Sequence, residues 1–155
     1  AGNVVRGREL EVLFRGDTEL CFLPLAHAYS CAFNFLVPMA IGAHVYILGK
    51  TPAPKILLKA FEEVKPNLIL TVPLILEKIY KKMILPQLSK TAVRLALNIP
   101  LLDNRIYAQI RKTLIDSLGG RFREVIVGGA AMNEEVTEFL YKIKFPFTIG
   151  YGMTE

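Results

Sequence analysis

The sequence predicts an α/β fold, with a mostly parallel five-stranded sheet and helices on both faces. Short apolar runs alternate along the 155 residues with segments whose apolar side chains repeat at helical spacing. Hydrophobic residues make up 52% of the chain, and its mean hydropathy is +0.37. Strands covered on both faces give such a composition because they are apolar throughout. The length allows one buried core.

Five apolar runs are predicted to be the strands, at residues 20–23, 43–48, 68–71, 124–127 and 146–149. Pro24 ends the first run and Gly49 ends the second. Helical segments lie between the strands, and this alternation predicts that neighbouring strands run mostly parallel.

Prolines bound the first two predicted helices. Residues 28–40 are expected to be helical, with Pro38 limiting their length. Thr51 is expected to cap the second helix, with Pro52 at its first position and Pro66 at its end. Its buried face is predicted from apolar residues at i, i+3, i+4 and i+7, which are Leu57, Ala60, Phe61 and Val64.

The later helices also have start and stop residues. Three residues are expected to begin them, and these are Pro73, Asp103 and Asn133. Pro86 is expected to end the helix that begins at Pro73, and Gly119-Gly120 the helix that begins at Asp103. A further short helix is expected at residues 89–99.

The domain organisation is predicted to be simple. Residues 1–17 are a polar lead-in, expected to be partly ordered, and residues 18–155 form a single α/β subdomain. The most apolar stretch, residues 20–48, is interrupted by proline, histidine and glycine, so no membrane-spanning helix is expected. Cys21 and Cys31 lack metal-type spacing and are expected to be free thiols in a reducing cytosol.

The positive charge is concentrated in one segment. The formal net charge is +5, and residues 77–124 hold ten lysines and arginines against four acidic residues. Solvated helix faces explain this pattern, and a basic surface near a phosphorylated ligand or an anionic membrane is the alternative. No nucleic-acid role is expected, because aromatic residues do not interleave with the charges.

Candidate functional residues follow the ends of predicted strands, where ligands bind in open parallel sheets. His27 follows the first strand, on a loop that Pro24 bends, and a buried core histidine is the alternative. The run Gly128-Gly129-Ala130-Ala131 follows the fourth strand. A flat ring could lie against its backbone, and tight strand–helix packing explains it equally well.

The run from Gly150 to Glu155, after the fifth strand, suits a nucleotide phosphate site. Gly150 and Gly152 let a ligand approach the backbone. Tyr151 offers a flat face, Thr154 a hydroxyl for a phosphate oxygen, and Glu155 a hard oxygen ligand for Mg²⁺. A cap on a following helix is the alternative for the last two. Because a domain rarely ends on such a cluster, we expect a piece of a longer enzyme.

Several enzyme classes are disfavoured. The sequence has no Gly-x-Ser-x-Gly elbow, no G-x-x-x-x-G-K-[ST] loop and no G-x-G-x-x-G fingerprint. Residues 18–102 contain no aspartate and only four glutamates, so a pair of opposed glycosidase carboxylates is hard to build there.

Three segments together resemble the adenylate-forming ligases, and within them the long-chain fatty acyl-CoA synthetases. They are Leu23-Pro24-Leu25-Ala26-His27, then Val72-Pro73 with Glu77-Lys78-Ile79-Tyr80, then Gly128-Gly129-Ala130-Ala131 with Tyr151-Gly152-Met153-Thr154-Glu155. The resemblance extends from about Asp17 to Glu155. The Tyr-Gly-x-Thr-Glu element is highly specific for the superfamily. The resemblance implies a subdomain of the AMP-binding domain, without the family's phosphate loop and its C-terminal lysine.

The resemblance implies that ATP and a fatty acid give an acyl-adenylate, from which CoA displaces AMP. It implies that His27 lies near the carboxylate and the acyl channel. The adenine would lie against the backbone of Gly129, Ala130 and Ala131 and the ring of Tyr151. Gly152 would border the nucleotide, Thr154 would touch the α-phosphate, and Glu155 would hold Mg²⁺.

Other functions stay open at this point. They are an aryl or medium-chain acyl-CoA ligase, an amino-acid adenylation domain, and a non-catalytic α/β binding module. The amino-acid domain is disfavoured because no aspartate lies between Asp17 and Asp103 to hold an ammonium group. The expected location is cytoplasmic, with peripheral contact at the inner face of a membrane. The sequence leaves the oligomeric state and the acyl-chain length open, and the chain alone is expected to fold but to lack activity.

Overall fold

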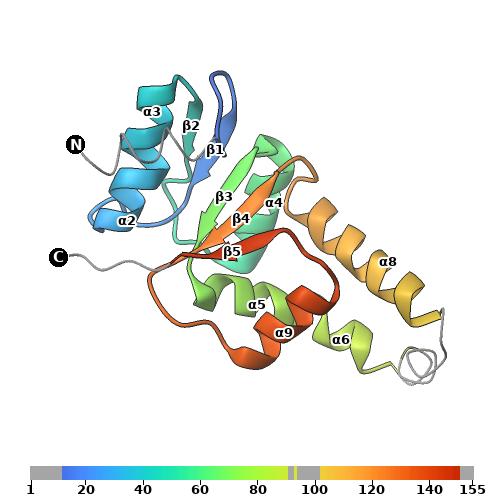
Figure 1. The fold of residues 1–155 in the computed structure, drawn as a ribbon. Helices are drawn as coiled ribbons and strands as arrows, with labels where there is room; N and C mark the ends of the chain where they lie inside the picture. The colour runs from blue at the N-terminus through green and yellow to red at the C-terminus, as the bar shows by residue number, and fades with distance from the viewer. Residues whose placement is uncertain (1–11, 91–92, 94–101, 151–155) are drawn as a thin grey trace.

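The computed structural model describes residues 12–90, 93 and 102–150 (Figure 1). In this part of the chain five parallel strands form one sheet in the order β2-β1-β3-β4-β5. Its strands are β1 (Thr18–Cys21), β2 (His44–Ile47), β3 (Leu68–Thr71), β4 (Glu124–Val127) and β5 (Phe147–Ile149). The predicted α/β fold is confirmed, and every described strand pair is parallel.

Helices connect the strands (Figure 1). Between β1 and β2 lie α2 (Ala28–Ser30), the π-helix η1 (Cys31–Leu36) and α3 (Val37–Ile41). The others are α4 (Pro54–Val64), α5 (Pro73–Met83), α6 (Leu85–Leu88), α8 (Leu102–Ser117) and α9 (Glu134–Lys142). None of the described helices is both long and apolar enough to cross a membrane.

The two faces of the sheet carry different cores. On one face, a large apolar cluster joins α4, α5, α8 and α9 to strand residues such as Leu20, Ile69 and Val125. On the other face, a smaller cluster places Leu68 and Leu70 of β3 against the segment that contains η1 and α3. The alternation of side chains along each strand therefore gives a three-layer arrangement.

The strand β1 begins two residues before the predicted start, at Thr18, and ends at Cys21. The predicted strand started with the apolar run at Leu20 and therefore did not include Glu19. In the structure this glutamate is fully buried in the middle of the strand. It is the main feature of the core that the sequence pattern did not predict.

The predicted start of the second helix is wrong. The helix α4 begins at Pro54, with Ala53 as its N-cap and no side-chain cap. Ala53 is extended, with φ −74° and ψ 144°. A residue that precedes proline is pushed out of the helical region, so Pro54 prevents a helix from starting at Pro52.

The helix predicted at residues 28–40 continues through Pro38 and ends at Gly42, which adopts φ +85°. A π-helical stretch precedes the proline, and the Val37 N–H donates to the carbonyl of Ala32. A proline ring clashes with the carbonyl four residues earlier in a regular α-helix. The wider π turn accommodates the ring, so Pro38 does not end the helix.

Of the other predicted helix starts, Pro73 and Asn133 are confirmed, whereas Asp103 lies inside the first turn of α8, which begins at Leu102. Pro73 begins α5, and Asn133 caps α9 by accepting a hydrogen bond from the Val136 N–H at 3.2 Å. Gly119 and Gly120 follow α8 with φ +97° and +69°. Pro86 does not stop the helical region, because it lies in the first turn of α6, where a missing N–H costs little. Most of the helix predicted at residues 89–99 lies outside the described residues.

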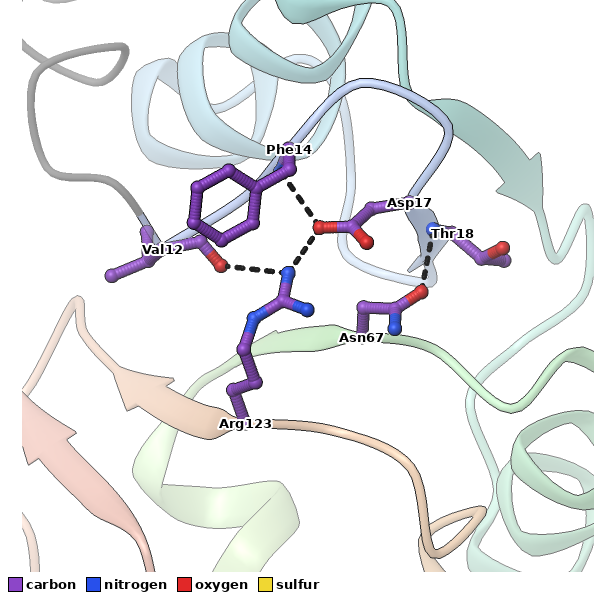
Figure 2. Close-up of polar contacts among 6 residues, drawn as sticks. All are labelled: Val12, Phe14, Asp17, Thr18, Asn67 and Arg123. Atoms are coloured by element: carbon purple, nitrogen blue, oxygen red, sulfur yellow. Dashed lines mark hydrogen bonds and ion pairs between the residues drawn. The ribbon is translucent and has the colours of Figure 1, made fainter.

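Polar side chains join the strands at the end of the sheet where the strands begin, which we call the amino end (Figure 2). Asp17 forms an ion pair with Arg123 and accepts a hydrogen bond from the Phe14 N–H at 2.7 Å. Arg123 also donates to the Val12 carbonyl at 3.3 Å. These contacts tie the segment before β1 to the start of β4.

A second contact in the same region involves Asn67, just before β3. Its Oδ1 accepts a hydrogen bond from the Thr18 N–H at 2.9 Å (Figure 2). The guanidinium of Arg123 also lies 4.9 Å from the centre of the Phe14 ring. The amino end is therefore bridged by side chains that directly precede three neighbouring strands, β1, β3 and β4.

Candidate active site at the carboxyl end of the sheet

The carboxyl ends of the strands meet at the opposite end of the sheet because all pairs are parallel. Three segments that contain predicted site residues lie there: the turn after β1, the turn after β4 and the first residue after β5. The register pairs Val127 with Ile149, so Gly128 and Gly150 are next to one another as the two strands end. The Gly150 N–H donates to the Val127 carbonyl at 2.8 Å.

Tyr29 brings the segment after β1 against the end of β4. Its hydroxyl donates to the Ile126 carbonyl at 3.2 Å. A Cβ on Gly128 would lie only 3.0 Å from Cζ of the Tyr29 ring. Gly128 therefore leaves the space that the ring occupies, and the sequence did not predict this contact because 97 positions separate Tyr29 from Ile126.

The turn after β4 is open to an incoming ligand. Gly129 adopts φ +86°, and the nearest atom to its Cβ position is Cγ1 of Val72 at 3.6 Å. Ala130 and Ala131 are exposed. Three successive small residues thus leave their backbone accessible beside the carboxyl end of β3. This geometry suits a flat ring lying against the chain.

Glu77 on α5 holds the far end of this turn. Its Oε1 accepts a hydrogen bond from the Asn133 N–H at 3.0 Å, and Asn133 is the N-cap of α9. The turn between β4 and α9 is thus fixed at Gly128 by strand pairing and at Asn133 by a carboxylate. Glu77 belongs to the Glu-Lys-Ile-Tyr segment of the resemblance, but its spacing alone did not reveal this role.

The structure places His27 on the surface, directly before α2. The backbone N–H of His27 donates to the Pro24 carbonyl at 3.1 Å, and its backbone carbonyl accepts from the Cys31 N–H at 2.9 Å. The exposed imidazole is not part of the described core, so the alternative of a buried core histidine is wrong. The predicted position of His27 beside a substrate carboxylate stays a prediction.

Four predicted site residues lie outside the described residues, and they are Tyr151, Gly152, Thr154 and Glu155. The described part of the chain holds no group of three or more histidine, cysteine or acidic residues that could bind a metal. The predicted Mg²⁺ ligand Glu155 is therefore untested. Two surface hollows, one between α4 and α8 and one along α8, are lined by none of the predicted site residues.

A buried acid lies behind the segment that carries His27. Glu19 is fully buried, and its Oε1 accepts a hydrogen bond from Asn34 Nδ2 at 2.6 Å. Its Oε2 has no hydrogen-bond partner among the described residues. Burial raises the pKa of the Glu19 carboxyl from 4.5 to about 8, and the Asn34 hydrogen bond offsets part of this rise.

The comparison with protein families decides the relationship. The family described as "AMP-binding enzyme" matches residues 2–155. The chain belongs to this family. The resemblance to adenylate-forming enzymes is thereby confirmed.

Curated relatives agree with the fatty acyl-CoA synthetase branch. Long-chain-fatty-acid–CoA ligase 1 of Saccharomyces cerevisiae is 30% identical, and the match covers 97% of this chain and 24% of the relative. Long chain acyl-CoA synthetase 6, peroxisomal, of Arabidopsis thaliana is 31% identical over 92% of this chain and 22% of the relative. The chain thus spans about a quarter of the length of the curated relatives it matches.

Solved structures agree with the fold. The A domain of carboxylic acid reductase from Segniliparus rugosus, in complex with AMP and a co-purified carboxylic acid, superposes with a TM-score of 0.68. It is 23% identical, and the match covers 99% of this chain and 25% of that protein. This likeness shows that the described sheet and helices share the fold of that domain.

Proposed function

We propose that the whole protein is an ATP-dependent long-chain fatty acid–CoA ligase, in which this chain supplies part of the adenylation site. The main support is that the carboxyl ends of β1, β4 and β5 lie at the same end of the sheet, in a chain of the AMP-binding family. The exposed turn of Gly129, Ala130 and Ala131 lies there, and Tyr29, which packs on Gly128, joins it to the segment that carries His27.

The proposed reaction has two steps. A carboxylate oxygen of the fatty acid attacks the α-phosphorus of ATP, the bond to the β-phosphate bridging oxygen breaks, and pyrophosphate leaves. The CoA thiol, losing its proton, then attacks the acyl carbonyl, and AMP leaves. The first step brings two anionic groups together, so hydrogen-bond donors and a cation must offset their charge.

Each predicted site residue has a role in this proposal. The backbone of Gly129, Ala130 and Ala131 and the ring of Tyr151 would hold the adenine, with Gly152 beside the nucleotide. Thr154 would donate to the α-phosphate, and His27 would donate to the substrate carboxylate. Glu155 would bind Mg²⁺, which prefers hard oxygen ligands and would supply charge neutralisation when bound.

A long-chain acid is the proposed substrate because the curated relatives carry that name. The described turn after β1 also offers no aspartate that could bind the ammonium group of an amino acid. We further propose a cytoplasmic protein with peripheral membrane contact. Its support is the basic segment, which exposes Lys78, Lys81 and Lys82 on α5.

The test is fatty-acid-dependent exchange of labelled pyrophosphate into ATP by the intact protein. This assay measures adenylation without CoA, and adding CoA should then yield acyl-CoA and AMP. Palmitate should support exchange, and benzoate, octanoate and amino acids should support less. Exchange that depends on an amino acid, or no exchange with any acid, would contradict the proposal.

His27 provides a residue-level test. The variant His27→Ala should lower exchange by about 10²-fold, the scale of a positioned polar group, with an unchanged melting temperature. The matched control is His44→Ala, because His44 is also exposed but lies on β2 at the amino end of the sheet. Equal loss in both variants would refute a role for His27 at the carboxylate.

A further inference from the structure

A buried polar network lies under the His27 turn, on the sheet face that η1 covers. Its first member is Glu19, in the strand β1 between β2 and β3. This side chain has no exposed surface, and its Oε2 has no hydrogen-bond partner among the described residues. A buried carboxylate with an unpaired oxygen is costly, so the neutral acid is the stable form.

Two side chains of the following helix complete the network. Asn34, in η1, donates from Nδ2 to Glu19 Oε1 at 2.6 Å. The Ser30 hydroxyl lies 3.2 Å from the Leu23 carbonyl and 3.3 Å from Asn34 Oδ1. Its single hydrogen can be donated to either oxygen. The network therefore joins β1, the π-helix and the residue that precedes Pro24.

The same segment holds the turn that carries His27. Leu23 begins this turn, and the His27 N–H closes it on the Pro24 carbonyl. Cys31, the first residue of η1, donates its N–H to the His27 carbonyl. Movement of η1 or of the Leu23 carbonyl would thus move His27 as well.

The groups that face Glu19 provide no compensating positive charge in the described part of the chain. Its register partners on β2 and β3 are Val45 and Leu68, which are apolar. The titratable neighbours are Cys21 on β1 and Tyr29 on α2, whose anions would repel a charged Glu19. Burial raises the pKa of both groups, so both are neutral near pH 7.

We propose that Glu19, as a neutral acid, is a positioning residue for the His27 turn, and that loss of its proton releases η1 and this turn. The hydrogen bonds to Asn34 and through Ser30 carry the effect. The consequence for catalysis rests on the proposed function, whereas the effect on η1 does not.

The direction of the pH effect follows from linkage. The pKa of Glu19 is 4.5 in the unfolded chain and about 8 in the fold, so the folded protein binds more protons between these values. The equilibrium constant for the local opening of η1 and its turn, in which Glu19 reaches water, therefore rises about tenfold per pH unit across that window and levels off above it. Above about pH 8 the charged oxygen requires water, which the closed network does not admit.

Hydrogen exchange in the intact protein tests the structural part. Amides of residues 28–41 should lose about tenfold in protection between pH 7 and 9, after correction for intrinsic rates, while residues 124–127 stay protected. Glu19→Gln keeps the shape and the acceptor for Asn34, so it should abolish this loss. The matched control Glu124→Gln, in β4, which β3 separates from β1, should behave like the wild type.

Pyrophosphate exchange over the same pH range tests the catalytic part. Wild-type activity should fall with an apparent pKa of about 8, with a rise in KM for the acid, and Glu19→Gln should lack this decline. Unchanged protection of residues 28–41 at pH 9, or an equal loss in Glu19→Gln, would overturn the proposal. If the variant does not fold, the wild-type comparison of residues 28–41 with 124–127 still decides. A protein that shows the expected hydrogen-exchange pattern but catalyses no pyrophosphate exchange would refute the proposed function and leave the role of Glu19 in η1 intact.

Discussion

Polar side chains join the strands at the amino end of the sheet, whereas glycines follow two of the strands at the carboxyl end. Asp17, Asn67 and Arg123 bridge neighbouring strands at the amino end (Figure 2). At the other end, Gly128 and Gly150 directly follow β4 and β5, the Tyr29 ring packs on Gly128, and the next residue, Gly129, is exposed. Side-chain contacts stabilise the amino end, and the proposed site lies at the carboxyl end.

Two glycines with similar backbone angles make the difference concrete. Gly119, at the amino end, has φ +97°, and its Cβ position lies 2.7 Å from the Phe61 carbonyl oxygen. Gly129, at the carboxyl end, has φ +86°, and its nearest neighbour lies at 3.6 Å. The first glycine is required by close packing of backbone on backbone. The second has only an ordinary van der Waals contact with Val72, so its positive φ, and not close packing, is what favours glycine there.

The largest expected effect is at the carboxyl end, in the variant Glu155→Gln of the intact protein. It keeps the side-chain shape and removes the charge that would bind Mg²⁺. Adenylation should fall by about 10²–10³-fold, with a higher Mg²⁺ concentration for half-maximal rate and unchanged binding of the apolar acid. Pyrophosphate exchange over a Mg²⁺ titration measures both quantities.

The control for that variant is Glu62→Gln, an exposed glutamate on α4. It should leave the rate and the Mg²⁺ dependence unchanged. A near-normal rate and an unchanged Mg²⁺ dependence in Glu155→Gln would leave only a helix-capping role for this residue.

The next effect is at the amino end, in Gly119→Ala. The added Cβ would meet the Phe61 carbonyl, and the positive φ is strained for alanine. The free energy of unfolding should fall by about 2–4 kcal/mol, measured by urea denaturation. The rate of pyrophosphate exchange per folded molecule should not change. A loss of adenylation without a loss of stability would contradict the separation of the two ends.

A smaller effect is expected for Arg123→Leu. The ion pair with Asp17 is partly buried, since the two side chains are 41% and 14% exposed. Its loss, with that of the bond to the Val12 carbonyl, should cost about 1–2 kcal/mol of stability. The exposed pair of Lys112 and Asp116 gives a control, because Lys112→Ala should cost less than about 0.5 kcal/mol. Equal losses would show that the amino-end contacts are ordinary surface pairs.

The sequence predicted those parts of the fold that depend on local chemistry. Pro73 and Asn133 begin helices because their own backbone and side chain favour a first turn, and Gly119 ends one because it tolerates positive φ. The same rules predict Thr51 as the cap of α4, but this prediction is wrong. Pro54 keeps the residue before it, Ala53, out of the helical region, so the helix begins at Pro54.

Contacts between distant residues could not be predicted in this way. The hydrogen bond of Tyr29 to Ile126 and the burial of Glu19 depend on how the strands are ordered in the sheet. The site was predicted from residue types after strand ends, and the structure brings His27, Gly129 and Gly150 to the same end. It does not describe residues 151–155, so the roles proposed for Thr154 and Glu155 still depend on the sequence.

The most direct measurement is hydrogen exchange of the intact protein with and without ATP, Mg²⁺ and a non-reactive fatty-acid analogue. The nucleotide should slow exchange in residues 128–131 and at Gly150, and leave the amino-end residues 119–123 unchanged. Protection confined to the amino end or to the hollow between α4 and α8, or none in any segment, would contradict adenylation at the carboxyl end of the sheet.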